Sequence, residues 1–369
     1  MRSWSWVPRR FPVWWCPSAR KVRCLMKIPL QVPKFPLLLR GRFFWIKIAL
    51  SLLGGAGIWL WSELRPVSLP PEGVSLYIPP RASTHWVAEE LYRHRVIRNP
   101  SLFRLYTRLK GIDKKILPGK YIFRGRLDLS QVAAELAKGP VLWRITVPEG
   151  FTLKELAELL ESRGIASADE FWRVVENYPF PYAFLREAPP GRRRLEGYLF
   201  PDTYEVPAGT PVQDIIDLML RRFAQIAREM QLEKGAQEQG LTLHQLVTLA
   251  SLVEREAKYD EERPLIAGVL YHRLRLGMPL QVDATVAYVL DKWKSPLTYT
   301  DLEVNSPYNT YRIKGLPPGP IASPGRASLN AVLHPEPTDY LYYVAKPDGY
   351  HAFARTLSEH EENIRRYRG

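Results

Sequence analysis

The stretch that decides the fold runs from Thr242 to Glu256 and reads TLHQLVTLASLVERE. Thr242 and Gln245 form the spacing of a capping box, so a helix is predicted to begin here. The helix is apolar over most of its length and ends in Glu254 and Glu256. Glutamate is rarely buried unless something holds it or uses it. The pair therefore predicts carboxyl groups that are either ion-paired or kept for proton transfer with a raised pKa.

Helical periodicity does not decide which glutamate faces a substrate. Residues two apart on a helix point about 200° apart, so only one of the two can face a given cleft. Each of them shares a helical stripe with apolar residues of the same run. The choice between Glu254 and Glu256 stays open at this point.

The segments around this helix predict a larger α+β domain over residues 146–369. A long helix is expected over about 211–230, and a further helix over about 267–274, which Gly277 ends. Dense prolines in 305–325 fix φ and predict a stiff loop. Alternating apolar residues in 340–345, a turn at 347–349 and a partner strand at 351–353 predict a hairpin, followed by a last helix from Ser358.

A duplicated pattern precedes this domain. Ile78-Pro79 and the residues that follow align with Val147-Pro148 and the residues after it at a constant offset. Each copy predicts a strand end, a turn, a capped amphipathic helix and a second helix. Residues 74–145 are therefore predicted to form a small α+β module. This module is either a spacer or a carbohydrate-binding module, and the sequence leaves both interpretations open.

One apolar segment, Phe43 to Ser62, is long enough to cross a bilayer, which takes roughly 20 residues. Trp45, Trp59 and Trp61 lie near its ends, where interfacial aromatics are common. A cleaved signal peptide is the alternative, but the long lead-in and the lack of a small-x-small cleavage site disfavour it. Residues 43–62 are predicted to be a transmembrane helix, and 63–73 a Pro-rich linker.

The charge is concentrated before this helix. Residues 1–42 contain ten Lys or Arg and no acid, whereas residues 63–369 contain 41 basic and 38 acidic residues, a net charge of +3. This distribution predicts a cytoplasmic N-terminus with residues 63–369 outside. It disfavours nucleic acid as a partner, because such a protein needs a basic face on the folded domain.

The basic arm, residues 1–42, lacks hydrophobic periodicity and is predicted to be disordered. Cys16 and Cys24 both lie in this arm, so no disulfide is expected in the exported part. Met26 stands as an alternative start of translation.

The chain contains no sequence signature of a metal site, a nucleotide loop or a serine nucleophile, so neither a metal nor a cofactor is expected. The chemistry-bearing residues are carboxylates, tyrosines, asparagines and tryptophans. Aromatic faces stack on sugar rings, while acids and amides bind hydroxyl groups. For an exported, membrane-tethered protein, this combination predicts work on the sugar polymer of a cell wall.

Five ordered motifs closely resemble the YceG-like, or MltG, endolytic murein transglycosylases, over about residues 45–366. The motifs are EGYLFPDTY (196–204), ASLVERE (250–256), LQVDATVAY (280–288), NTY (309–311) and GLPPGPI (315–321). The resemblance implies a single N-terminal transmembrane helix, a small LysM-like α+β module and a larger α+β catalytic domain. The basic arm before residue 43 departs from the usual pattern of the family.

The resemblance also implies an activity. The family cleaves the β-1,4 bond between N-acetylmuramic acid and N-acetylglucosamine in nascent peptidoglycan and leaves a 1,6-anhydro end. Such an enzyme would sit in the bacterial inner membrane, act on glycan strands near peptidoglycan synthases and terminate strand elongation. Its catalytic glutamate is the second one of the ASxxExE motif, which falls on Glu256. One carboxyl suffices, because the muramyl 6-hydroxyl attacks its own anomeric carbon.

Other polar residues are expected near this glutamate. The residues expected to line the glycan cleft are Gln281, Asp283, Tyr288, Asn309 and Tyr311. Their alternative role is structural, since an aspartate at 283 suits the cap of a helix from Ala284 and an asparagine at 309 suits a turn.

A second group is expected to support the site or to hold the backbone, and it consists of Glu196, Asp202 and Glu254. His351 is expected in a hairpin and His360 on a helix surface. Arg255, Arg273 and Arg275 are expected on solvated helix faces, and contact with peptide-stem carboxylates is the alternative.

Two rival functions stay open. A hydrolytic muramidase would use Glu256 as the acid and Asp283 or Asp202 as a second carboxylate. A non-catalytic scaffold would bind the wall through the LysM-like module and recruit synthases or division proteins.

Overall fold

The computed structural model describes residues 37–368, with side chains described for 44–367. The chain divides into two compact units, Met1–Ser62 and Glu63–Gly369. Most of the basic arm, with Cys16 and Cys24, lies outside the described residues.

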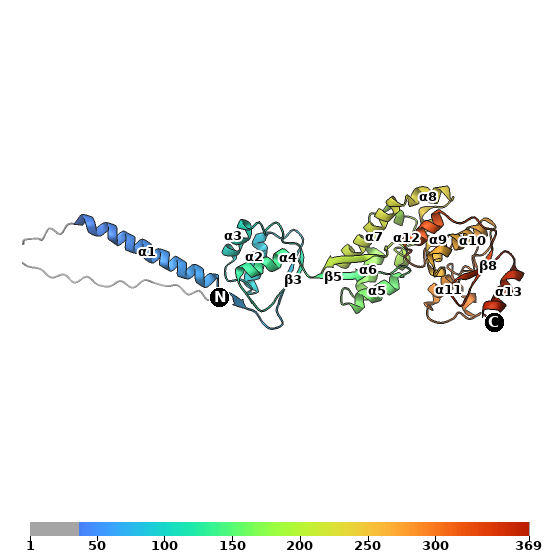
Figure 1. Cartoon of the computed structure of the whole chain (residues 1–369), viewed down its shortest axis with the longest axis horizontal. Coiled ribbons are helices and arrows are strands. Elements are labelled where there is room, and N and C mark those ends of the chain that lie inside the picture. Colours follow the sequence, from blue (N-terminus) through green and yellow to red (C-terminus); the bar gives the residue numbers. More distant parts are fainter. Residues whose placement is uncertain (1–36, 369) are drawn as a thin grey trace, which may run out of the picture. The chain divides into compact units, whose positions relative to one another are not determined.

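The first element is α1, Leu37–Glu63, which begins ahead of the predicted Phe43 (Figure 1). Its stretch Phe44–Glu63 is long and apolar enough to span a membrane. Large side chains such as Trp45, Leu53 and Ile58 are exposed along it. Apolar surface of this extent is compatible with a single-pass membrane anchor, because it would be costly to leave in water.

The duplicated pattern folds twice into the order strand, helix, helix, strand. The first copy consists of β2 (Val74–Ile78), α2 (Thr84–Arg93), α3 (Pro100–Leu109) and β3 (Gly119–Phe123). The second copy consists of β5 (Leu142–Thr146), α5 (Leu153–Ser162), α6 (Ala168–Asn177) and β6 (Thr203–Pro207). In each copy the two strands pair antiparallel, β2 with β3 and β5 with β6. Short strands β1 (Val67–Ser68) and β4 (Arg126–Leu127) pair beside the first copy, and α4 (Leu129–Lys138) follows it.

Local sequence explains why these helices start where they do. Ser83 accepts a hydrogen bond from the amide of Trp86 at the start of α2, and Thr152 forms a capping box with Glu155 at the start of α5. Each cap satisfies backbone donors that the first helical turn leaves unpaired. The predicted caps therefore fix both first helices of the repeat.

The two copies differ in how they are buried. The first copy has its own hydrophobic cluster, which runs from Leu76 to Leu136 and includes Phe103. The second copy shares one cluster with the C-terminal helices, from Ile145 to Leu333. Because β5 already begins at Leu142, the second copy starts slightly before the predicted domain boundary at residue 146.

The C-terminal body is mainly helical. Short helices η1 (Ala183–Leu185) and η2 (Gly191–Arg193) precede β6, and the following elements are α7 (Val212–Glu229), α8 (Leu232–Glu238), α9 (Leu243–Glu256), η3 (Asp260–Glu262), α10 (Arg263–Arg275), α11 (Asp283–Leu290), η4 (Asp301–Glu303) and α12 (Arg326–Leu333). The antiparallel hairpin β7 (Tyr342–Ala345) and β8 (His351–Ala354) and the helix α13 (Leu357–Arg368) end the chain. The predicted long helix, hairpin and last helix are confirmed.

Helix α9 lies in the centre of this body, packed against α8, α10 and α12 (Figure 1). Every residue from Leu246 to Val253 is buried, so the helix has no solvated face along this stretch. Each fully buried Leu or Val contributes about 1.5–3 kcal/mol, which fixes the helix firmly in place. Its last residues, 254–256, which include both glutamates, are only partly buried.

Three of the sequence motifs meet on α9. His244 bonds the Tyr198 hydroxyl (2.7 Å) through Nδ1 and the Pro318 carbonyl (2.8 Å) through Nε2. Ser251 accepts a hydrogen bond from the amide of Ile321 (3.1 Å). Gly197 has φ +81°, and a Cβ there would lie 2.5 Å from Pro320, so only glycine fits. The motifs thus build a rigid frame around the helix.

Candidate active site

A cleft of about 900 Å³ opens at the C-terminal end of α9. It is formed by the end of α9, the start of α11, residues 297–302, the β7–β8 hairpin and α13. The polar and aromatic side chains that line it are Arg255, Glu256, Arg273, Gln281, Asp283, Thr298, Tyr299, Tyr311, Tyr342, Tyr343, His351 and His360. The structure therefore brings Glu256, Gln281, Asp283 and Tyr311 to one cleft.

Glu256 is half-buried and lies beside Tyr343 of strand β7. Burial, followed by the neighbouring carboxylate and a side-chain hydrogen bond to Glu256, holds the pKa of Tyr343 well above its usual value. The phenol therefore stays protonated and donates its hydrogen to the Glu256 carboxyl. The sequence did not single out Tyr343. Its only signal was the alternation of apolar residues that predicted the strand.

Glu254 points away from this cleft and is held in place. Its side chain is 5% exposed and forms an ion pair with Arg263 (3.3 Å). Its second oxygen accepts a hydrogen bond from the amide of Gly325 (2.9 Å). Glu149 lies close by, and burial together with the charge of Glu254 raises the pKa of Glu149. Glu254 thus connects α9 to α10 and to the start of α12.

Asp283 and Tyr311 form a pair within the cleft, with the tyrosine hydroxyl donating to the carboxylate. Burial and the charge of Asp283 raise the pKa of Tyr311. Asp283 is itself the first residue of α11, and Val282 is the cap without a side-chain bond. The capping role considered for Asp283 is therefore wrong, because its carboxylate faces a tyrosine and not the helix amides.

Gln281 has an unusual backbone conformation, and its side chain is bonded to the buried Arg273. Its φ of +54° lies in the left-handed region, which costs free energy for a residue other than glycine. Its side-chain oxygen accepts a hydrogen bond from Arg273 (3.2 Å), and its backbone amide donates to the Thr310 carbonyl (3.1 Å). This arrangement directs an amide group toward the cleft.

The two arginines near the cleft are not on solvated faces, so that expectation is wrong. Arg273 is 5% exposed and donates to the carbonyls of Leu341 (2.6 Å) and Leu280 (2.8 Å). Arg255 donates to the Gly150 carbonyl (3.0 Å), and its guanidinium lies 3.8 Å from the ring centre of Trp293. Both cations are retained because backbone oxygens and aromatic faces replace their hydration.

The structure separates Tyr288 and Asn309 from the cleft lining. Asn309 is fully buried, and its amide nitrogen donates to the carbonyls of Leu302 (2.8 Å) and Val304 (2.9 Å). Its side-chain oxygen accepts the amide of Tyr311 (3.0 Å), so Asn309 holds the turn that carries the cleft tyrosine. The structural alternative for Asn309 is the one that the geometry supports.

Tyr288 donates its hydroxyl to Glu196 (2.9 Å), which also accepts the amide of Leu153 (3.0 Å). Glu196 is 3% exposed, and burial raises its pKa to about 7. The pair joins α11 to the first turn of α5. It therefore supports the body from inside, away from the residues that line the cleft.

Asp202 also has structural partners. It accepts hydrogen bonds from Arg222 (2.8 Å) and from the amide of Thr203 (2.7 Å) at the start of β6. It is absent from the residues that line the cleft.

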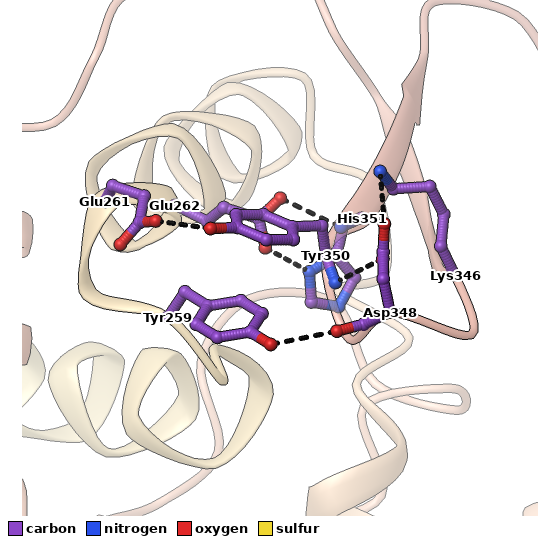
Figure 2. A network of polar contacts seen from close by, with 7 residues as sticks. All are labelled: Tyr259, Glu261, Glu262, Lys346, Asp348, Tyr350 and His351. Atoms are coloured by element: carbon purple, nitrogen blue, oxygen red, sulfur yellow. Dashed lines mark hydrogen bonds and ion pairs between the residues drawn. The ribbon is translucent and has the colours of Figure 1, made fainter.

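Two histidines line the cleft, one on the hairpin and one on α13. His351 opens β8, as predicted, and is bonded through Nδ1 to Glu262 (2.9 Å) (Figure 2). His360 lies on α13, where its ring stacks on Tyr342 with centres 5.2 Å apart. The expectation of a plain helix surface for His360 is wrong, because the residue is half-buried and lines the cleft.

Within the residues that the structure describes, no group of three His, Cys, Asp or Glu side chains is placed to hold a metal ion. The residues that line the cleft are instead carboxyl, amide, phenol and guanidinium groups, which bind and protonate oxygen atoms of an organic substrate.

The family model described as YceG-like matches residues 76–366, from β2 into α13. The chain belongs to the YceG-like family. This YceG-like chain is 34% identical to an endolytic murein transglycosylase of Bacillus subtilis, over 86% of this chain and 91% of the relative. It is 29% identical to an endolytic murein transglycosylase of Streptococcus pneumoniae, over 86% of this chain and 63% of that longer protein.

A solved structure agrees with this assignment. The crystal structure of a yceG-like protein from Listeria monocytogenes superposes with a TM-score of 0.55 at 31% identity, covering 79% of this chain and 99% of the other. The resemblance inferred from the five sequence motifs is therefore confirmed at the level of the YceG-like family.

Proposed function

We propose that this chain is an endolytic lytic transglycosylase that acts on peptidoglycan. The observation that carries the proposal is the half-buried Glu256, which lines an open cleft of about 900 Å³ and is hydrogen-bonded to Tyr343. The name of its relatives, endolytic murein transglycosylase, supports the same activity.

The reaction needs two proton transfers, and Glu256 takes part in both. Protonated Glu256 donates its proton to the glycosidic oxygen as the bond from that oxygen to the anomeric carbon of N-acetylmuramic acid breaks. The 6-hydroxyl oxygen of the same sugar then forms a bond to the anomeric carbon, and its proton passes to the Glu256 carboxylate. The products are a free 4-hydroxyl and a 1,6-anhydro end, and the enzyme is returned to its starting state.

The hydrogen bond from Tyr343 gives the two carboxyl oxygens of Glu256 different roles. A phenol that stays protonated donates to one oxygen in both states of the carboxyl group. The second oxygen is then the one that carries the transferred proton. This arrangement suits a residue that acts first as an acid and then as a base.

The rest of the cleft supplies groups that suit a glycan. Gln281 presents an amide, Asp283 with Tyr311 a carboxylate–phenol pair, and Tyr299 an aromatic ring that is 91% exposed. We assign glycan contacts to these residues. Tyr288 and Asn309 support them from the interior through Glu196 and the Tyr311 turn.

The same geometry bears on the hydrolytic rival. Asp202 is bonded to Arg222 and does not line the cleft, so it does not suit the second carboxylate of a muramidase. Asp283 does line the cleft, although one of its oxygens is occupied by the Tyr311 hydroxyl. The products therefore decide between the two reactions.

The apolar N-terminal helix supports a proposal for where the enzyme acts. Helix α1 would anchor it in the bacterial inner membrane, with the basic arm in the cytoplasm and residues 63–369 facing the wall. Residues 74–145, a strand–helix–helix–strand unit with its own core, would form a LysM-like glycan-binding module. Peptidoglycan synthases would be partners, because nascent strands are the substrate and their cleavage terminates elongation.

The test uses the full-length protein in detergent micelles with purified glycan strands in water enriched in ¹⁸O. The wild type is expected to release 1,6-anhydro ends without ¹⁸O, as measured by mass spectrometry. Glu256→Gln removes the proton donor and is expected to lower the rate by about 10²–10⁴-fold.

Glu303→Gln, an exposed carboxyl next to the cleft residue Leu302, is the matched control and is expected to keep the wild-type rate. Incorporation of ¹⁸O would show hydrolysis. Undiminished cleavage by Glu256→Gln would remove Glu256 from the mechanism, and absence of cleavage by the folded wild type would favour the scaffold.

A further inference from the structure

The carboxylate of Glu262 holds His351 at two points. One oxygen accepts the backbone amide of His351 (2.8 Å) and the other bonds its ring Nδ1 (2.9 Å). The two side chains are 10% and 7% exposed. Glu262 directly precedes α10, so its carboxylate also sits at the positive end of that helix. Both the main chain and the imidazole ring of His351 are therefore fixed (Figure 2).

The held imidazole packs on the tyrosine that contacts Glu256. The rings of His351 and Tyr343 lie on the paired strands β8 and β7, with centres 5.4 Å apart and planes at 86°. Edge-to-face packing of this kind is favourable and restricts ring rotation. Tyr343 in turn is hydrogen-bonded to Glu256, and all three side chains line the cleft.

We propose that His351 and Glu262 are positioning residues that keep the Tyr343 hydroxyl on the carboxyl group of Glu256. The inference rests on the proposed function, because it assigns a role toward the acid and base of that reaction. Neither residue needs to touch the substrate. A small misplacement of Tyr343 would let the carboxyl group of Glu256 rotate. Displacements of about 1 Å in an active site can lower a rate by roughly 100-fold.

Several charged side chains lie near the Tyr343 hydroxyl. Besides burial, the charges of Glu256 and Asp283 raise the pKa of Tyr343, and that of Arg273 lowers it. The hairpin is attached on its outer side by a separate set of contacts. Tyr350 donates to Glu261 (2.6 Å) and stacks on Tyr259 with centres 4.1 Å apart. This outer contact gives a control that attaches the same hairpin but is not part of the path to Glu256.

The experiment is a double-mutant cycle in the full-length protein in detergent, with kcat and KM measured on glycan strands. Tyr343→Phe is expected to lower kcat by roughly 10- to 100-fold with KM nearly unchanged. His351→Gln keeps a donor for Glu262 but loses the aromatic ring, and it is expected to lower kcat by roughly tenfold. If His351 acts through Tyr343, the double variant is no slower than Tyr343→Phe alone.

The pH–rate profile supplies a readout that loss of folding would not move. Both single variants deprive the ionised Glu256 carboxylate of a well-placed donor, which disfavours its charged form. The alkaline limb of kcat is therefore expected to move to higher pH in both. Glu262→Gln, which keeps the side-chain volume, is expected to shift the limb in the same direction, and it tests the path should His351→Gln fold poorly.

Tyr350→Phe is expected to keep the wild-type kcat and pH profile. Multiplicative losses in the double variant, or an equal loss in Tyr350→Phe, would overturn the positioning role and leave Glu256 in place as the acid. If Glu256→Gln itself stayed active, the proposed function would fail first, and this inference with it.

Discussion

Replacement of Glu196 by glutamine should change how the stability of the protein depends on pH. Glu196 is 3% exposed, and burial raises its pKa to about 7 from an ordinary value of 4.5. An acid whose pKa is raised in the native state stabilises the fold fully below pH 4.5, where both states are protonated. That stability is lost as the pH rises toward 7, because the unfolded chain gives up its proton first.

The expected size follows from the two pKa values. A difference from 4.5 to about 7 corresponds to a loss of about 3 kcal/mol between those pH values. Glutamine cannot ionise, yet its side-chain oxygen can still accept the amide of Leu153. The Tyr288 hydroxyl can reverse its role and accept from the new amide nitrogen. Glu196→Gln should therefore be close to the wild type at pH 4.5 and more stable by about 3 kcal/mol at pH 8.

The assay is denaturant unfolding of both full-length proteins in detergent, followed by near-ultraviolet circular dichroism at intervals from pH 4.5 to pH 8. A conservative control is Glu205→Gln, an exposed carboxyl on β6, which should give no pH-dependent difference. A stability difference between Glu196→Gln and the wild type that stays constant over this range would refute the reasoning. So would a difference that grows toward acid.

Two further predictions concern residues that hold the cleft from behind. Glu254→Gln removes the ion-pair partner of Arg263, whose side chain is 8% exposed, and should destabilise the protein by about 3 kcal/mol. Cleavage per folded molecule should be largely kept. Thermal unfolding and a rate assay check this, and a folded but inactive variant would contradict it. Asn309→Ala leaves the carbonyls of Leu302 and Val304 without their donor and should lower the free energy of unfolding by about 2–3 kcal/mol. It should also raise KM more than it lowers kcat. An unchanged melting temperature would contradict this structural role.

Much of the fold was predictable because its signals are local. The caps at Ser83 and Thr152 and the apolar spacing after them define α2 and α5, and the turn at 347–349 defines the last hairpin. The end of the second copy was not predicted. Its strand β6 follows a long irregular segment and pairs with β5, and no local turn signal in the sequence predicts this pairing.

The candidate site was predictable where a motif carries it and not where long-range packing does. Glu256, Gln281, Asp283 and Tyr311 belong to motifs and share the cleft. Periodicity could not separate Glu254 from Glu256, since the ion pair with Arg263 and the bond from Gly325 depend on tertiary contacts. Tyr343 reaches Glu256 from a strand far along the chain, and no local pattern marks such a meeting.

The order of these parts along the chain has a consequence for biogenesis. Glu256 is synthesised well before the hairpin that brings Tyr343 and His351 to it. A chain that leaves the ribosome N-terminus first therefore carries an incomplete active site until its last segment has emerged. If residues 63–369 are exported as proposed, the cleft is completed only once the C-terminal hairpin has crossed the membrane, and the wall is spared until then.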